Sequence, residues 1–407
     1  MQVLVEGSGG SSGWPQQGCR CASCLRQAAD GNVRIRSTIV IDGRVRLGVG
    51  VGVGVGVGVG DGDGDGDGDG AGYLVRRLPD AAGGREKPDA GEQQKPDAAD
   101  GPDRPDAAGV RGGPGARGGG AGGWDVTTPD GGRLLYPGGP GAVPVPPEGA
   151  APYDVAFLDV LGDPAQLGWL RARGLITADT VTVVAFADHR VPSEGELERR
   201  CGFWRVRLAA DGEAISPSRS AQKGLMGVTG TRRVLVLGGA RSGKSERAEL
   251  RLAGEPHVTY VATGMTGADD PDWTARVAAH RARRPAWWRT TETTDLAGVL
   301  ATARGALLID GIGGWLAAVL DECGAWDNPG TAREKLAGPI AELIGAWRQT
   351  TAYVVAVSDE TGLGVVPATP AGRLFRDELG RLNQALAAES EEAELVVAGR
   401  VLPLEVR

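Results

Sequence analysis

The residues best suited to chemistry in this chain form one short run, Gly238-Gly239-Ala240-Arg241-Ser242-Gly243-Lys244-Ser245. The run fits the pattern G-x-x-x-x-G-K-[ST], in which glycines let backbone N–H groups wrap phosphates. Lys244 would reach the β- and γ-phosphates of a nucleoside triphosphate, and Ser245 would bind its Mg²⁺. An apolar strand over 233–237 precedes the run, and 246–252 can continue as a helix. This context favours a phosphate-binding loop over a chance match in a glycine-rich chain.

A carboxylate follows a second apolar stretch, Ala306-Leu-Leu-Ile309, as Asp310. Phosphate-binding loops are paired with an acid at the end of a neighbouring strand, where it holds the hydrated Mg²⁺. We therefore expect Asp310 and Ser245 to hold the Mg²⁺ of a bound ATP or GTP.

The chain has three histidines, His189, His257 and His280. His257 directly precedes a strand and is interpreted as an ordinary loop residue. His280 lies in a helix-like stretch ended by Pro285, four residues after Arg276 and just before more arginines. Neutral imidazole can attack phosphorus, and guanidinium groups would stabilise phosphate charge. From these residues alone, a solvated basic helix with an incidental histidine is the favoured interpretation.

The elements that must position these groups alternate between strand and helix from Arg232 onward. This alternation predicts an α/β domain over 232–407, with a parallel sheet and helices on both faces. The expected strands are 233–237, 258–262, 305–309, 352–357 and 393–397.

The chain before this domain is uneven in composition. Glycine accounts for 68 of 407 residues, far above the usual ~7%, and the excess lies between about 48 and 149. Residues 48–150 contain Val-Gly and Asp-Gly repeats and are predicted to be mostly disordered, with some strand near 133–136. The Asp-Gly run lacks the spaced ligands and terminal Glu of a calcium loop, so it is interpreted as a repeat expansion.

Two parts of the N-terminal region can fold. Residues 1–47 carry β-rich runs at 3–5 and 38–41, and residues 151–213 form an αβ fragment without an evident partner core. Residues 214–231 are predicted to be a linker. Within the fragment we expect strands over 154–158, 180–187 and 203–208, and helices over 163–173 and 193–200.

Composition bounds the cellular setting and the partners. The net charge of −8 argues against a nucleic-acid binder held by a broad basic surface. No stretch approaches the ~18 apolar residues of a membrane span, and the first ten residues lack the features of a signal peptide. Five cysteines, three of them in Cys19-Arg-Cys21-Ala-Ser-Cys24, are spaced more like a metal site than a disulfide framework. We expect a cytoplasmic protein that does not insert into membranes.

A series of ordered blocks between Arg232 and Leu402 closely resembles the bifunctional adenosylcobinamide kinase / adenosylcobinamide-phosphate guanylyltransferase family of cobalamin biosynthesis. The blocks are Gly238–Ser245, Tyr260–Gly264, Ala275–His280 with Arg284-Pro285, Trp288–Glu292, Leu308–Gly311, Ser358–Pro367 and Arg373–Gln384. One departure from the family is a slightly longer loop, Met265–Asp272, before the histidine helix.

The resemblance implies a RecA-like P-loop sheet, a homotrimer and two reactions. The γ-phosphate of ATP or GTP passes to the aminopropanol hydroxyl of adenosylcobinamide. A histidine then attacks the α-phosphate of GTP, and GMP passes to adenosylcobinamide phosphate to give adenosylcobinamide-GDP. His280 stands at the motif position and takes the role of nucleophile, beside Lys244. The positions that match GTP contacts in the family are Ala262, Thr263, Gly264, Arg281, Ala282, Arg283, Arg284, Glu292 and Asp310.

A nucleotide-binding regulatory module, whose N-terminal part engages a partner, is the alternative interpretation. Such a module needs no nucleophilic histidine, so His280 and its arginines distinguish the two.

The N-terminal region is similar to a metallo-β-lactamase-like domain of the phosphodiesterase branch. The similarity rests on the opening strand, Gly7–Gly13, the cysteine cluster and the late Asp188-His189-Arg-Val-Pro. It implies a structural zinc ion in a tetrahedral Cys₃His site made of Cys19, Cys21, Cys24 and His189. The chain has no H-x-H-x-D-H motif, and Phe186 stands where that branch carries a metal-binding histidine. We therefore expect a degenerate, non-hydrolytic domain, with three unliganded thiols as the alternative for the cluster.

Overall fold

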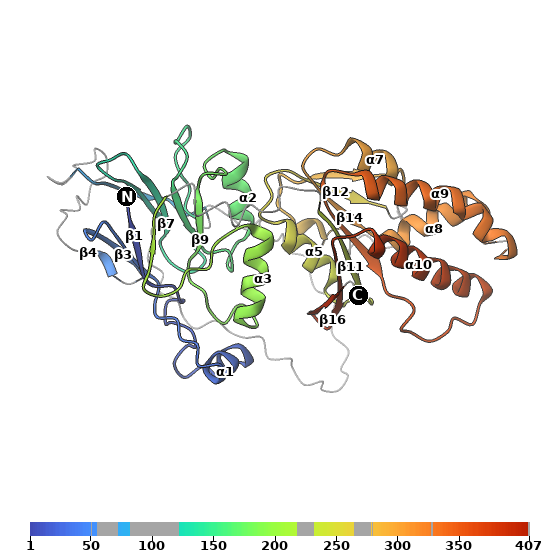
Figure 1. The fold of residues 1–407 in the computed structure, drawn as a ribbon, viewed down its shortest axis with the longest axis horizontal. Helices are drawn as coiled ribbons and strands as arrows, with labels where there is room; N and C mark the ends of the chain where they lie inside the picture. The colour runs from blue at the N-terminus through green and yellow to red at the C-terminus, as the bar shows by residue number, and fades with distance from the viewer. Residues whose placement is uncertain are drawn as a thin grey trace, which may run out of the picture.

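The computed structural model describes residues 1–49, 51–54, 72–81, 122–217, 232–263, 278, 280–326 and 329–405. Figure 1 shows the N-terminal strands on one side of the molecule and the C-terminal sheet on the other, with helices between them. No helix in these ranges combines the length and the apolar character needed to cross a membrane.

The N-terminal domain contains two five-stranded sheets. The first has the order β10-β1-β2-β3-β4 and is antiparallel throughout. The second has the order β5-β6-β7-β8-β9, and its last three strands are parallel. The strands are β1 (Val3–Gly7), β2 (Thr38–Ile41), β3 (Val45–Gly48), β4 (Val51–Gly54), β5 (Leu74–Leu78), β6 (Gly123–Thr127), β7 (Arg133–Pro137), β8 (Val155–Leu158), β9 (Val181–Val184) and β10 (Glu213–Ile215).

The two sheets pack face to face, and helices cover the outer face of the second. Alternate residues of the strands, such as Val3 and Val155, meet in the core between the sheets. Ala156 and Leu158 face the other way, toward helices α2 (Ala165–Ala172) and α3 (Glu194–Trp204). A further helix, α1 (Ala22–Ala29), contains Cys24 of the cysteine cluster, and Gln27 in this helix donates to Glu194 at the start of α3.

These elements correct several expectations. Residues 1–47 and 151–213 share a common core, so the αβ fragment does have a partner core. Residues 72–81 and 122–150 are ordered, so 48–150 is not mostly disordered in its described part. Strand β10 begins before the predicted linker and extends into it, and pairs with β1. The rest of the low-complexity sequence and 218–231 lie outside the described residues.

The expected strand over 203–208 is wrong, because Phe203 and Trp204 end helix α3. Adjacent side chains of a strand point to opposite faces, whereas both of these rings are buried on the side of α3 that meets the C-terminal domain. The predicted strand over 180–187 is confirmed only at 181–184. The predicted helix over 163–173 is confirmed as α2, and Ser193 caps α3 by accepting a hydrogen bond from the N–H of Glu196.

The C-terminal domain is a seven-stranded sheet of order β13-β12-β14-β15-β11-β16-β17, parallel except for the last pair. Helix α5 (Lys244–Leu252) covers one face. The helices on the other face are α7 (Leu296–Thr302), α8 (Ile312–Glu322), α9 (Pro329–Gln349) and α10 (Pro370–Ala388). The strands are β11 (Arg232–Gly238), β12 (Val258–Ala262), β13 (Arg289–Glu292), β14 (Ala306–Asp310), β15 (Tyr353–Asp359), β16 (Glu392–Val397) and β17 (Arg400–Leu404). All five predicted strands are confirmed to within two residues, and β13 and β17 were not predicted.

Candidate active site

Six strands of the C-terminal sheet run parallel and end at one edge. The register pairs Gly238 of β11 with Asp359 of β15, and it pairs Ala262 of β12 with both Asp310 of β14 and Glu292 of β13. Ligands of open α/β sheets bind outside the carboxyl ends of the strands. This edge is therefore the place where the predicted residues can act together.

The predicted phosphate-binding loop joins β11 to α5. Gly243 caps α5 with a φ of 95°, a conformation that glycine adopts without a Cβ clash. The Lys244 ammonium lies 3.1 Å from the Gly239 carbonyl oxygen and 2.9 Å from a carboxylate oxygen of Asp359. Both acceptors hold the ammonium at the amino end of α5, where the helix dipole attracts anions. Of the remaining loop residues, Gly239, Ala240 and Arg241 are exposed, whereas Gly238 and Ser242 are buried.

Asp310 connects this loop to His280. Its Oδ1 accepts a hydrogen bond of 3.4 Å from the Ser245 hydroxyl. Its Oδ2 accepts a hydrogen bond of 2.6 Å from the Tyr260 hydroxyl and lies 3.4 Å from His280 Nδ1. The hydroxyl of Ser245 and the carboxylate of Asp310 are oxygen ligands of the kind that Mg²⁺ prefers, so the two residues fit the predicted metal role.

The surroundings keep Asp310 ionised. Burial alone would raise the pKa of this carboxyl group, because it disfavours the charged form. Hydrogen bonds from His280 and Tyr260, together with the charge of Lys244, outweigh burial and hold the pKa of Asp310 below its usual value. Burial and the neighbouring Asp310 carboxylate both raise the pKa of the Tyr260 hydroxyl. Tyr260 therefore keeps its proton and donates the hydrogen bond to Asp310.

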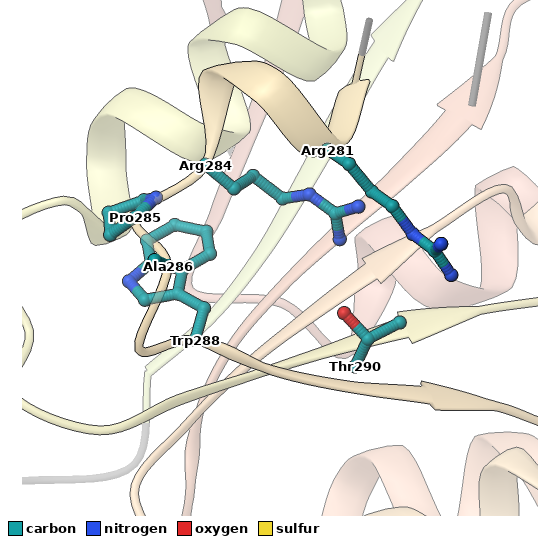
Figure 2. A pocket seen from close by; sticks show the side chains of 6 residues that line it. All are labelled: Arg281, Arg284, Pro285, Ala286, Trp288 and Thr290. Carbon is teal, nitrogen blue, oxygen red and sulfur yellow. The ribbon is translucent and has the colours of Figure 1, made fainter. Parts of the chain in front are cut away.

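The arginines after His280 divide between a pocket and neighbouring acids. Arg281 and Arg284 extend over Thr290 in Figure 2 and help to line a pocket of about 300 Å³. The Arg284 guanidinium lies 3.5 Å from the centre of the Tyr260 ring, its Nε donates to the His280 carbonyl, and its Nη1 is buried without a partner in the described chain. A buried, unpaired guanidinium nitrogen is suited to an anionic ligand.

The other predicted contact residues do not line this pocket. Arg283 is turned away and forms a two-pronged ion pair with Glu249 of α5. Ala282 is exposed, and Glu292 lies at the surface 3.4 Å from Arg281. Thr263 is buried and donates to the Gly311 carbonyl, so it fixes the backbone beside Asp310. Gly264, Arg276 and the longer loop Met265–Asp272 lie outside the described residues.

Three residues at this site were not singled out from the sequence, namely Tyr260, Asp359 and Glu249. Asp359 follows an apolar strand just as Asp310 does, so the same signal was present for it. Glu249 follows Ser245 by one helical turn, a spacing that places both on one face of α5.

A second cluster lies in the N-terminal domain. One ligand atom from each of Cys19, Cys21, Cys24 and His189, the four residues that the N-terminal resemblance implies, lies within 4.8 Å of the other three. Burial raises the pKa of Cys24 to about 11, whereas the backbone N–H of Cys24 lowers the pKa of Cys21. Three thiols and an imidazole at such separations fit a tetrahedral zinc ion.

No second cluster of this kind occurs among the residues that the structure describes. Phe186, at the position where the similar phosphodiesterase branch carries a metal-binding histidine, is fully buried. Nearby, Arg190 forms ion pairs of 2.7 Å with Asp159 and 2.8 Å with Asp188. The Arg190 guanidinium group therefore neutralises the carboxylates of Asp159 and Asp188.

Comparison with known proteins assigns the C-terminal domain. The family model for cobinamide kinase / cobinamide phosphate guanyltransferase matches residues 234–404. The bifunctional adenosylcobalamin biosynthesis protein CobP of Pseudomonas aeruginosa is 42% identical over 179 residues, which cover 42% of this chain and 97% of that protein. The proteins named CobU from Salmonella typhimurium and Escherichia coli are 38% and 36% identical, and each match covers 41% of this chain and 96% of the relative.

Proposed function

The chain belongs to the cobinamide kinase / cobinamide phosphate guanyltransferase family, and from this premise we propose how its C-terminal domain carries out both reactions. The domain phosphorylates adenosylcobinamide with ATP or GTP. It then transfers GMP from GTP to adenosylcobinamide phosphate, and the product is adenosylcobinamide-GDP.

The phosphate-binding loop serves the kinase step. The triphosphate lies against the backbone N–H groups of Gly238–Ser245, and Lys244 exchanges its contacts with Gly239 and Asp359 for phosphate oxygens. Ser245 and Asp310 would hold a Mg²⁺ ion, which would supply positive charge against the phosphates. The substrate hydroxyl oxygen forms a bond to the γ-phosphorus as the bond from that phosphorus to the β-phosphate oxygen breaks. ADP or GDP leaves, and the hydroxyl proton is released to solvent.

His280 serves the transferase step. When Nδ1–H donates to Asp310, the lone pair of the ring lies on Nε2, which is then the nucleophilic atom. A bond forms between Nε2 and the α-phosphorus of GTP while the bond to pyrophosphate breaks. An oxygen of adenosylcobinamide phosphate next attacks the same phosphorus and releases His280. Arg281 and Arg284 would stabilise the phosphate charge from the pocket that they help to line.

The observation that carries this proposal is the single carboxylate shared by Ser245 and His280. A nucleotide-binding module would need the phosphate loop, but it would not need a histidine held by the same acid. The shared carboxylate therefore supports a transferase over the regulatory alternative.

Incubation with α-labelled GTP tests the transferase step. We expect an acid-labile, alkali-stable label on the wild-type protein, as a phosphoramidate bond predicts, and no label on the His280→Ala variant. His257→Ala is the matched control, since His257 is exposed and precedes the amino end of β12, opposite the end that reaches the sheet edge, and it should be labelled like wild type. Absence of label on the wild type would overturn the histidine mechanism.

We also propose a structural zinc ion at Cys19, Cys21, Cys24 and His189. Elemental analysis of the purified full chain should find one zinc ion per chain, and Cys21→Ser should lose most of it. Cys323→Ser is the control, because Cys323 is a free thiol in the C-terminal domain. Equal zinc content in the two variants would contradict the proposed site.

The finer assignments of fold, assembly and location are part of the same proposal. Two facing sheets with helices outside support a degenerate metallo-β-lactamase-like fold, and the parallel strands around β11 support a RecA-like sheet. We further propose that the protein forms a homotrimer, and light scattering can test its mass in solution. We also propose that it has no nucleic-acid partners. None of the five cysteines forms a disulfide, which suits a cytoplasmic location.

A further inference from the structure

The face of α5 opposite the active site is covered by the N-terminal domain. In Figure 1, α3 lies beside α5, between the two halves of the molecule. The indole N–H of Trp204 donates to the Leu250 carbonyl at 2.9 Å, and Arg171 of α2 donates to the carbonyl of Gly254 at 2.7 Å. Leu250 packs against the core of the N-terminal domain. These contacts satisfy carbonyl groups near the carboxyl end of α5 with side chains of the other domain.

A buried ion network extends this contact toward the phosphate loop. Arg247 donates to Glu196 of α3 at 2.8 Å and, with two nitrogens, to Glu394 of β16 at 2.9 and 3.0 Å. The guanidinium groups of Arg247 and Arg251 both lie over the ring of Phe203, at 5.1 and 5.2 Å. Arg247, Glu196, Glu394, Arg251 and Phe203 are all buried. Buried charges are costly unless they are paired, and the Arg247 guanidinium has one acceptor in each domain, so both domains contribute to its pairing.

Arg247 stands in the first turn of α5, three residues after Lys244. Its backbone N–H donates to the Gly243 carbonyl at 2.9 Å, which closes that turn onto the phosphate loop. A force that holds the Arg247 side chain therefore also holds the peptide from which Lys244 and Ser245 project. The relatives align over nearly their whole length with about two fifths of this chain, so they have no counterpart of α3.

We propose that the N-terminal domain acts as a brace, meaning that its contacts hold the phosphate-binding helix α5 in place. Arg247, held between Glu196 and Glu394, is then a positioning residue for the nucleoside triphosphate. The inference rests on the proposed function of the loop. The role of this domain is then to fix the start of α5, which needs no hydrolytic metal centre.

The test compares Glu196→Gln with Glu198→Gln in the full-length chain. Both substitutions remove one negative charge from α3, but Glu198 is exposed whereas Glu196 holds Arg247. Affinity for Mg-ATPγS is measured by calorimetry at a temperature where all variants are folded by circular dichroism. We expect Glu196→Gln to bind roughly 3- to 10-fold more weakly and Glu198→Gln to bind like wild type. A rise in KM for the nucleotide should accompany the weaker binding.

Purely structural packing would lower the unfolding temperature without changing the affinity of the folded protein. Equal affinities in Glu196→Gln and wild type would therefore overturn the brace. If Glu196→Gln does not fold, Phe203→Leu removes the ring beneath both guanidinium groups and tests the same coupling. Failure of the wild type to bind Mg-ATPγS would instead overturn the proposed function of the loop, so the two failures are distinguishable.

Discussion

Substitution of Gly168 by alanine should weaken the contact between the two domains. Gly168 lies inside α2, and a Cβ there would be 2.7 Å from the carbonyl oxygens of both Ala253 and Glu255. These are backbone atoms just after α5, so they cannot rotate away as a flexible side chain could. Such overpacking lowers the free energy of unfolding by about 1–3 kcal/mol. The methyl group also favours the helix by about 0.5–1 kcal/mol relative to glycine, which offsets part of the cost.

Gly202→Ala separates these two effects. Gly202 lies inside α3, and a Cβ there would meet no atom within 4 Å. It should therefore show only the helix gain, and the unfolding free energies of the two variants should differ by about 1–3 kcal/mol. Urea unfolding followed by tryptophan fluorescence suits the measurement, because Trp204 lies in the contact. If both variants became more stable by the same amount, the close approach of α2 to the end of α5 would be refuted.

Three further predictions concern the active site and the ion network. Lys244→Ala should lower phosphate transfer from γ-labelled ATP to adenosylcobinamide by about 100-fold or more, and kinase turnover near wild type would show that the phosphate site is elsewhere. Tyr260→Phe should reduce the unfolding free energy by about 1.5–3 kcal/mol, because Asp310 loses a hydrogen bond. Tyr353→Phe, whose hydroxyl has no partner in the described chain, should change it little, and equal effects in urea unfolding would count against the Tyr260 contact. Burial raises the pKa of Glu196, but Arg247 and Arg200 outweigh it, so folding lowers this pKa below its ordinary value of 4.5. The pairing should therefore stabilise the protein above that pH and be lost as the pH falls below it, and Glu196→Gln should flatten the fall of the urea midpoint as the pH is lowered below 4.5.

The sequence was sufficient to predict the phosphate loop and Asp310 because each follows an apolar strand at a fixed spacing. His280 needed the family resemblance, since the residues around it, taken alone, favour a solvated basic helix. Asp359 carried the same signal as Asp310, yet its role depends on β15 lying between β14 and β11, and strand order is not written in any local pattern. Tyr260 was missed because a tyrosine in a buried strand is ordinarily a core residue.

The N-terminal domain was harder to predict for a different reason. Its second sheet combines strands on both sides of the low-complexity sequence, so neither half shows a complete core by itself. The contact between domains joins Glu196 to Arg247, residues that look like the solvated charges of two surface helices. Glu196 and Arg247 pair only because α3 and α5 lie side by side in the fold, which no local sequence pattern predicts.

Helix α5 shows how these levels are connected. Its sequence, KSERAELRL, has few apolar residues and would be expected at the surface, yet most of its length is buried. Residues four apart share a face of a helix, so Ser245 and Glu249 point toward Asp310 and Arg283, whereas Arg247 and Arg251 point toward Glu394. One polar face thus belongs to the active site, and the other belongs to the contact with the N-terminal domain. Ion pairs and hydrogen bonds on both polar faces allow α5 to be buried although it has few apolar residues. A substitution that removes the partner of one face therefore also acts on the residues of the other face, because both faces belong to the same short helix.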